Sequence, residues 1–315
     1  MSARPEPTEE LGPKALEELS PVEGYPRAEG LSTGARLARL FSAGPLHIAV
    51  IAICLVWTVP TFGLIISSFR PARLITTTGW WSAFQAPLNF TLANYQSVLG
   101  QEGMGRSFIN SLIITFPAVT LTILVAGLAA YAFAWMEFPG RDWLFLLVIG
   151  LLVVPLQMTF IPILRLFTAL HLTGNFVGIW LAHTAYGLPF AIFLLRNFFA
   201  ALPKELFEAA FLEGASHLKV FFRIVLPLSV PSIAALGIFQ FLWVWNDLLV
   251  ALIYLGGAAN VAPMTLTISN LVSSFGTEWQ ILTAAAVISM LLPLVIFFAL
   301  QRYFVQGILA GAVKG

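Results

Sequence analysis

The sequence predicts an all-α integral membrane protein, and two observations support this fold class. Hydrophobic residues make up 59% of the 315-residue chain and charged residues only 10%, whereas a soluble domain carries roughly a quarter charged residues. In addition, six apolar segments are each long enough to cross a bilayer, which takes roughly 20 helical residues. These segments lie near residues 46–68, 108–135, 143–167, 176–195, 232–254 and 281–303. We therefore expect six transmembrane helices.

The segment before the first apolar run, residues 1–44, is rich in Pro, Glu, Gly and Arg. This composition is typical of a disordered tail, and the tail is too long and too acidic for the start of a signal peptide. The simplest interpretation is a solvated leader without a specific function. We expect a tail over residues 1–44, a membrane domain over residues 45–305 and a short C-terminal tail over residues 306–315.

Several of the apolar segments contain residues that disturb a helix. They are Pro155 and Pro162 in the third segment, Gly187 and Pro189 in the fourth, and Pro293 in the sixth. Such breaks are tolerated inside a membrane where they line a cavity or pack against neighbouring helices. They are also common in membrane helices generally, so each one alone is weak evidence for a transport pathway.

The loop at residues 202–231 is the longest charged interruption in the second half of the chain. Pro203 suits the first position of a helix, and Glu208 lies near the positive end of its dipole. Gly214 is placed to end this helix, and Ser216 could cap a second short one. The sequence thus predicts two short amphipathic helices outside the bilayer, in a form suited to docking into another protein.

The distribution of positive charge predicts the orientation of the spans. With a cytoplasmic N-terminus, the inner side collects most of the 16 Lys and Arg residues. The outer side then keeps only Arg70, Arg73, Arg106 and Arg165. Because positive charge marks the cytoplasmic side, both termini and the loop at residues 202–231 should be cytoplasmic. The connections at residues 70–107 and 255–280 should lie outside, as contact surface for an external partner or merely as interfacial structure.

The loop at residues 202–231 also resembles the EAA loop of bacterial ABC-importer permeases. The matching residues are Glu208, Ala209, Ala210, Gly214, Ile224, Leu226 and Pro227. In that family the loop forms a coupling helix in a cleft of the cytoplasmic ATPase subunit. The resemblance implies that Glu208 orients the loop, that Ala209 and Ala210 pack closely, and that Gly214 allows the turn. Glu213 departs mildly, since the family more often has Asp there. The alternative is an ordinary amphipathic loop between spans.

The resemblance extends from the first span to the end of the chain. Residues 188–199, 245–247 and 301–315 are similar to the carbohydrate branch of these permeases, of the maltose-transporter type, and to its second permease. Residues 58–63 and 77–81 resemble α-glucoside permeases more specifically. The resemblance implies the type I ABC-importer permease fold in a bacterial inner membrane. In relatives the C-terminal tail, here residues 307–315, reaches towards the ATPase, and the last outer loop contacts the binding protein.

The partners that the resemblance implies are a second permease subunit in a heterodimer, an ATPase dimer and an extracytoplasmic sugar-binding protein. ATP and Mg would bind to the ATPase, and this chain would bind no cofactor itself. The sequence agrees with this division, since it contains no Gly-rich phosphate loop and its four histidines lack zinc-ligand spacing. Its single cysteine, Cys54, excludes a disulfide within the chain.

Asp247 is the only acidic residue inside the six apolar segments, and an acid within a membrane is a functional candidate by default. Gln240, Trp243 and Asp247 would share a helical face, with Asn246 beside it. A Trp ring and hydrogen-bonding groups suit a sugar. Alternatively, Asp247 holds neighbouring helices together through hydrogen bonds, and in the best-known relative the sugar rests mainly on the companion permease. His183, Asn110 and Gln157 are also polar at membrane depth, where hydrogen bonding between helices is the simpler role.

We expect the chain to form half of the pore of an ATP-driven sugar importer and not to be an enzyme. The alternatives are an ABC importer for a non-sugar solute, a secondary transporter and a membrane-embedded enzyme. A proton-coupled transporter would more often carry several ionisable residues in its spans. An enzyme would need a clustered acid, base, nucleophile or metal site at one depth, and no such set is visible in the sequence.

Overall fold

A computed structural model describes residues 33–85, 88–100, 103–274 and 278–312. Within these residues all regular secondary structure is helical. The chain divides into two compact units, residues 1–60 and 61–315. The predictions for residues 1–32 and 313–315 lie outside the described residues. Helix α2 (Thr33–Ser68) begins within the segment that the sequence predicts as a tail.

A series of short helices follows α2, before the long helices of the second unit begin. The short ones are α3 (Ala72–Thr77), the 3-10 helix η1 (Trp80–Phe84) and α4 (Ala93–Gly100). Next come α5 (Met104–Trp135), α6 (Arg141–Leu151), α7 (Leu156–Ala169) and α8 (Phe176–Phe199). The predicted loop contains α9 (Lys204–Leu212), α10 (His217–Val220), the π-helix η2 (Phe221–Val225) and α11 (Leu226–Leu228). The chain ends with α12 (Val230–Trp245), α13 (Leu249–Leu255), α14 (Met264–Ser274) and α15 (Trp279–Ala312).

Four helices in the described residues are long and apolar enough to cross a membrane. They cover residues 44–68, 104–135, 176–199 and 279–302. Two further stretches pass the same test as bent pairs, and counting each pair as one span gives the predicted six. The fold class that the sequence predicts, an all-α membrane protein, is confirmed.

The third predicted span is bent. Helices α6 and α7 meet at 103° instead of forming one rod. Pro155 lies directly before α7 with φ −60° and ψ 123°. Proline has no N–H to continue a helix, and it disfavours the helical conformation of the residue before it. The break therefore follows from one of the prolines that the sequence marks as helix-disturbing.

The fifth predicted span, residues 232–254, is also not a single helix. Helix α12 ends at Trp245, and α13 begins at Leu249. At its other end α12 meets the stretch His217–Leu228 at 78°, so the second bent pair lies further back in the chain than the predicted segment. The side chain of Asp247 stabilises the start of α13, as described below.

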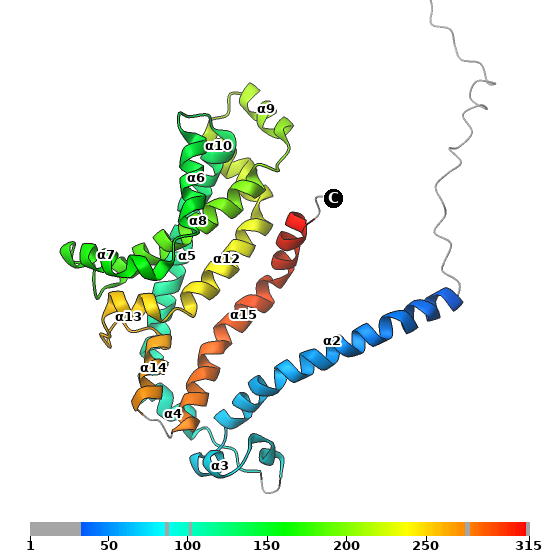
Figure 1. The fold of residues 1–315 in the computed structure, drawn as a ribbon, viewed down its shortest axis with the longest axis vertical. Coiled ribbons are helices and arrows are strands. Elements are labelled where there is room, and N and C mark those ends of the chain that lie inside the picture. Colours follow the sequence, from blue (N-terminus) through cyan, green and yellow to red (C-terminus); the bar gives the residue numbers. More distant parts are fainter. Residues whose placement is uncertain (1–32, 86–87, 101–102, 275–277, 313–315) are drawn as a thin grey trace, which may run out of the picture. The chain divides into compact units, whose positions relative to one another are not determined.

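Helix α5 is central to the packing of the second unit, because it contacts α4, α6, α8, α12 and α14. The buried side chains form three clusters along this assembly. One of them joins α5 and α8 to Phe207, Val220 and Phe221 of the predicted docking loop. Within this unit α9 and α10 lie at one end, and α4 and α14 lie at the other (Figure 1).

The connection after α2 is organised by the buried guanidinium of Arg70, which is 2% exposed. It donates to the carbonyl oxygens of Leu74 at 3.0 Å and Thr78 at 3.3 Å, to Ser82 Oγ at 3.1 Å, and to Thr78 Oγ1. Asn94 Nδ2 in turn donates to the Arg70 carbonyl oxygen at 2.9 Å. These bonds order the connection from within the chain itself.

Candidate functional site

The first helix of the loop, α9, presents most of its surface to the outside. Pro203 directly precedes the helix, and Glu208 and Ala209 are exposed. Phe207 is its only buried residue, at 2% exposure. The loop also exposes large apolar side chains, Leu212 at 90% and, on α10, Leu218 at 63%. An outer surface that carries both charged and apolar side chains, on a helix anchored by the buried Phe207, is suited to contact with another protein.

Gly214 ends α9 as the sequence predicts. Its φ of +80° lies in the left-handed region, which glycine adopts without steric cost. The Gly214 amide donates to the Phe211 carbonyl oxygen at 3.0 Å, and the Ala215 amide donates to that of Ala210, also at 3.0 Å. This pair of bonds is a Schellman motif. A Cβ added at Gly214 would meet no atom within 4 Å, so the backbone alone favours glycine here.

Ser216 caps the second helix, as the sequence also predicts. Its Oγ accepts a hydrogen bond from the Lys219 amide at 3.4 Å. Helix α10 then passes into the π-helix η2. π-helices are rare in proteins, and those that occur are often found at functional sites. Leu226, which is half-buried, and Pro227, which is exposed, follow in α11. The two halves of the predicted motif therefore lie on one continuous loop. Ala210, in the first half, is half-buried against the cluster that contains residues of α5 and α8.

The predicted solute-contact residues do not share one helical face. Helix α12 ends at Trp245, so the helical spacing that would align Asp247 with Gln240 and Trp243 does not reach Asp247. Gln240 is buried and donates to Thr122 Oγ1 on α5 at 3.5 Å, whereas Trp243 is 38% exposed. Asn246 is exposed, and its side-chain amide donates to the Leu242 carbonyl oxygen at 2.8 Å. Gln240 therefore joins two helices.

The carboxylate of Asp247 caps α13. Its Oδ1 accepts from the Val250 amide at 3.3 Å, and its Oδ2 accepts from the Ala251 amide at 3.0 Å. Thr265 Oγ1 donates to the Asp247 carbonyl oxygen at 2.6 Å, which ties this turn to α14. Both carboxylate oxygens therefore bond to the start of α13, and it is the Asp247 backbone carbonyl, not the carboxylate, that contacts another helix.

His183 on α8 is brought to Trp243 and Asp247. Its ring meets that of Trp243 edge to face, with the centroids 5.8 Å apart and an angle of 84° between the planes. Nε2 lies 3.9 Å from Asp247 Oδ2. The side chain is 1% exposed, and Nδ1 has no hydrogen-bond partner among the described residues. The sequence did not group His183 with these residues, because only the fold places the middle of α8 beside the end of α12.

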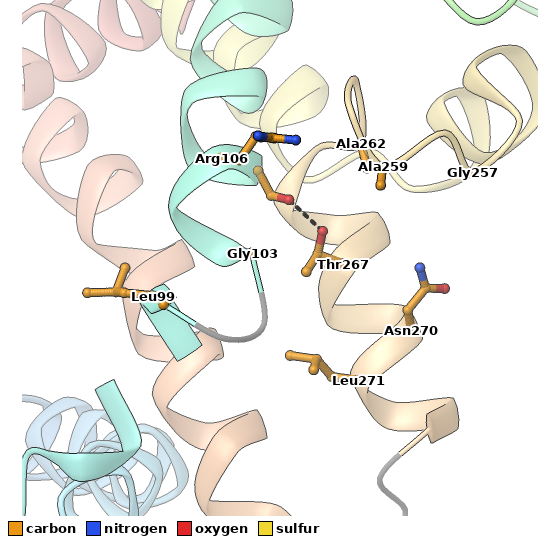
Figure 2. Close-up of a pocket in the computed structure, with 11 residues that line it drawn as sticks. Leu99, Gly103, Arg106, Gly257, Ala259, Ala262, Thr267, Asn270 and Leu271 are labelled. Atoms are coloured by element: carbon orange, nitrogen blue, oxygen red, sulfur yellow. Dashed lines mark hydrogen bonds between the residues drawn. The ribbon is translucent and has the colours of Figure 1, made fainter. Parts of the chain in front are cut away.

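A hollow of about 480 Å³ lies where the two predicted outer connections meet (Figure 2). The start of α5 contributes Arg106 and Ser107, and the segment after α13 contributes Gly257, Thr267 and Asn270. Ser107 Oγ and Thr267 Oγ1 share a hydrogen bond of 2.6 Å across its wall. Arg106 and Asn270 are exposed. The hollow thus offers a guanidinium and an amide to a ligand or partner.

Comparison with known proteins supports the fold. Over 86% of its length, the chain is 60% identical to the osmoprotective compounds uptake permease protein GgtD of Synechocystis sp. PCC 6803, and the match covers 92% of that protein. It is 38% identical to the alpha-glucoside transport system permease protein AglG of Rhizobium meliloti, over 86% of this chain and 97% of AglG.

A solved structure has the same architecture. It is a bacterial ABC transporter involved in the import of the acidic polysaccharide alginate; the TM-score is 0.72 at 20% identity, with 85% of this chain and 98% of the solved chain covered. This similarity confirms the type I ABC-importer permease fold. The family described as binding-protein-dependent transport system inner membrane component matches residues 107–310. The chain belongs to this family of ABC-importer permease subunits, which are not themselves enzymes.

Proposed function

We propose that the chain is one of two permease subunits of an ATP-driven importer of an α-glucoside, with both termini in the cytoplasm. The observation that carries this proposal is the loop from α9 to α11. It consists of two short helices joined by a turn in which the backbone angle alone favours glycine. Its outer surface carries exposed acidic and apolar side chains. A companion permease would complete the pore.

The loop would dock into a partner ATPase, which would bind the ATP and Mg. Glu208 is exposed and so is available for a charged hydrogen bond to the ATPase. Leu212, at 90% exposure, would be covered on docking. Closure of two ATPase subunits around ATP would pull on the loop and turn the pore from inward-facing to outward-facing. ATP hydrolysis would return it.

For the solute, the name of AglG and the resemblance of residues 58–63 and 77–81 support an α-glucoside. The exposed ring of Trp243 could cover the C–H face of a sugar. His183 is buried, so it would position the ring of Trp243 through their edge-to-face contact and would not meet the solute itself. Asp247 would act indirectly, by holding the turn after α12. The companion permease would contribute the remaining contacts.

The 60% identity to a permease for osmoprotective compounds favours a second candidate solute, namely a small osmoprotective compound. Reconstituted transporter should be tested with radiolabelled α-glucosides and with a panel of osmoprotectants in competition. Uptake that is displaced by osmoprotectants and not by α-glucosides would replace the first candidate with the second.

The external binding protein would dock on the outer connections. The family description names binding-protein-dependent transport, and the hollow presents Arg106 and Asn270 at its surface. We expect a carboxylate of the binding protein to enter the hollow and pair with Arg106.

The assembly is tested by purifying the tagged chain from its native membranes in mild detergent, beside a Glu208→Lys/Gly214→Pro variant. We expect the wild type to bring down a second permease and an ATPase, and we expect the variant to lose the ATPase while keeping the second permease. Recovery of the wild-type chain alone would contradict the proposal and favour a secondary transporter.

A further inference from the structure

The inner end of α5 carries Gly127, Tyr131 and Trp135 at intervals of four residues, so the three lie on one face of the helix. All three meet the loop that follows α8, Trp135 at α9 and the other two at its second half. We call these three residues the aromatic face of α5. None of them belongs to the motif by which the loop resembles its family.

Trp135 holds α9. Its ring stacks on the ring of Phe207 with centroids 3.6 Å apart and 13° between the planes. Phe207 is the only buried residue of α9, so this stack is the inward anchor of that helix. The indole Nε1 of Trp135 also donates to the carbonyl oxygen of Phe199, the last residue of α8, at 3.0 Å. One side chain thus joins the ends of α5 and α8 to α9.

Tyr131 and Gly127 hold the second half of the loop. The Tyr131 hydroxyl and His217 Nδ1 on α10 are 3.0 Å apart and share a hydrogen bond. The Tyr131 ring also packs on Phe221 of η2, with a centroid distance of 5.5 Å. At Gly127 a Cβ would lie 3.5 Å from Phe221 Cζ, which is ordinary contact, so Phe221 packs closely against the α5 backbone. Both helices of the loop are therefore seated on the same stretch of α5.

The covalent connections of the loop to α8 and α12 are less suited to transmit a displacement than its side-chain packing on α5. Towards α12, the chain bends by 78° between the stretch His217–Leu228 and the helix Val230–Trp245. Towards α8, residues 200–203 separate the end of that helix from the start of α9. A bent or non-helical segment can absorb a displacement, whereas closely packed side chains transmit it.

We infer that the aromatic face of α5 transmits the movement of the loop to the pore, with Trp135 and Tyr131 as positioning residues for coupling. This inference rests on the proposed function. From this face α5 runs to Thr122, which accepts a hydrogen bond from Gln240 of α12, and on to Arg106 at the outer hollow. It also packs along α8, which carries His183. A displacement of α9 therefore reaches both ends of the unit through one helix.

The test measures ATP hydrolysed per solute imported, for the complete importer in proteoliposomes with its binding protein. Trp135→Leu and Phe207→Leu should each raise this ratio about threefold to tenfold, from the loss of one aromatic pair. The double variant should be no worse than either single variant, because the two rings act as one unit. Trp135→Phe keeps a ring to stack but loses the hydrogen bond to Phe199, so its ratio should lie between those of the wild type and Trp135→Leu.

The matched control is Trp143→Leu on α6, since Trp143 is 77% exposed and should leave the ratio unchanged. His217→Ala serves if the core variants do not accumulate, because His217 is exposed and its removal breaks the bond to the Tyr131 hydroxyl without opening the core. An unchanged ratio in His217→Ala, or additive effects in the double variant, would overturn the inference. If the wild type recruits no ATPase, the proposed function fails instead, so the two failures are distinguishable.

Discussion

Replacement of Gly214 should impair coupling through backbone strain alone. The residue has a φ of +80°, and a Cβ there would meet nothing within 4 Å. Alanine in the left-handed region costs about 1–2 kcal/mol, which corresponds to a factor of roughly 5–30 in the population of the turn. Asparagine is larger but tolerates this region better. The expected order of activity is therefore Gly, then Asn, then Ala.

Proline at the same position should be the most damaging substitution. It fixes φ near about −65° and has no N–H, so it cannot adopt the native angle or donate to the Phe211 carbonyl oxygen as the Gly214 amide does. Gly214→Pro should abolish coupled transport while the chain still inserts into the membrane.

The assay for this series is solute uptake in proteoliposomes, with ATPase co-purification measured on the same preparations. The diagnostic comparison is between the Asn and Ala variants. A steric effect would make the larger Asn side chain the worse of the two. If Asn impairs uptake as much as Ala or more, the backbone explanation is refuted and Gly214 must instead be buried against a partner.

Three further predictions concern the second unit. Asp247→Ala leaves the start of α13 uncapped and should lower the free energy of unfolding by about 1 kcal/mol, whereas Asp247→Asn keeps an acceptor and should cost less; equal losses in a detergent melting experiment would argue against the cap. Gly178→Ala places a Cβ 1.9 Å from the Leu172 carbonyl oxygen, so it should destabilise the chain by about 1–3 kcal/mol, and an unchanged melting temperature would disprove this close approach. Arg106→Glu should reduce stimulation of the ATPase by the binding protein, less so at high salt, while the exposed Arg165→Glu should not; equal effects would remove Arg106 from the docking site.

The loop was predictable from the sequence because its signals are local. A glycine that ends a helix and a serine that starts the next act through hydrogen bonds within a few residues, so Gly214 and Ser216 have the predicted roles in the structure. Hydropathy likewise located every span except the fifth, because a bilayer requires long apolar segments.

The solute-contact prediction depended on an unbroken helix from Gln240 to Asp247. Periodicity cannot reveal a break within an apolar run, and here the side chain of Asp247 forms competing hydrogen bonds with the backbone amides of α13. The contact of His183 with Trp243 joins residues sixty positions apart, and no local pattern encodes it. Trp135 and Phe207 were overlooked for the same reason, since an aromatic residue in an apolar segment gives no sign of its partner.

The leucines on the outside of the loop, Leu212 and Leu218, have a consequence for the life of the subunit before assembly. In the proposed arrangement the loop lies in water, where the bilayer would not cover these side chains as it covers those of the spans. A newly made copy therefore displays the kind of surface that proteases and chaperones act on. Binding of a partner would hide it, so the abundance of this chain should follow the supply of the partner, and surplus copies should be degraded.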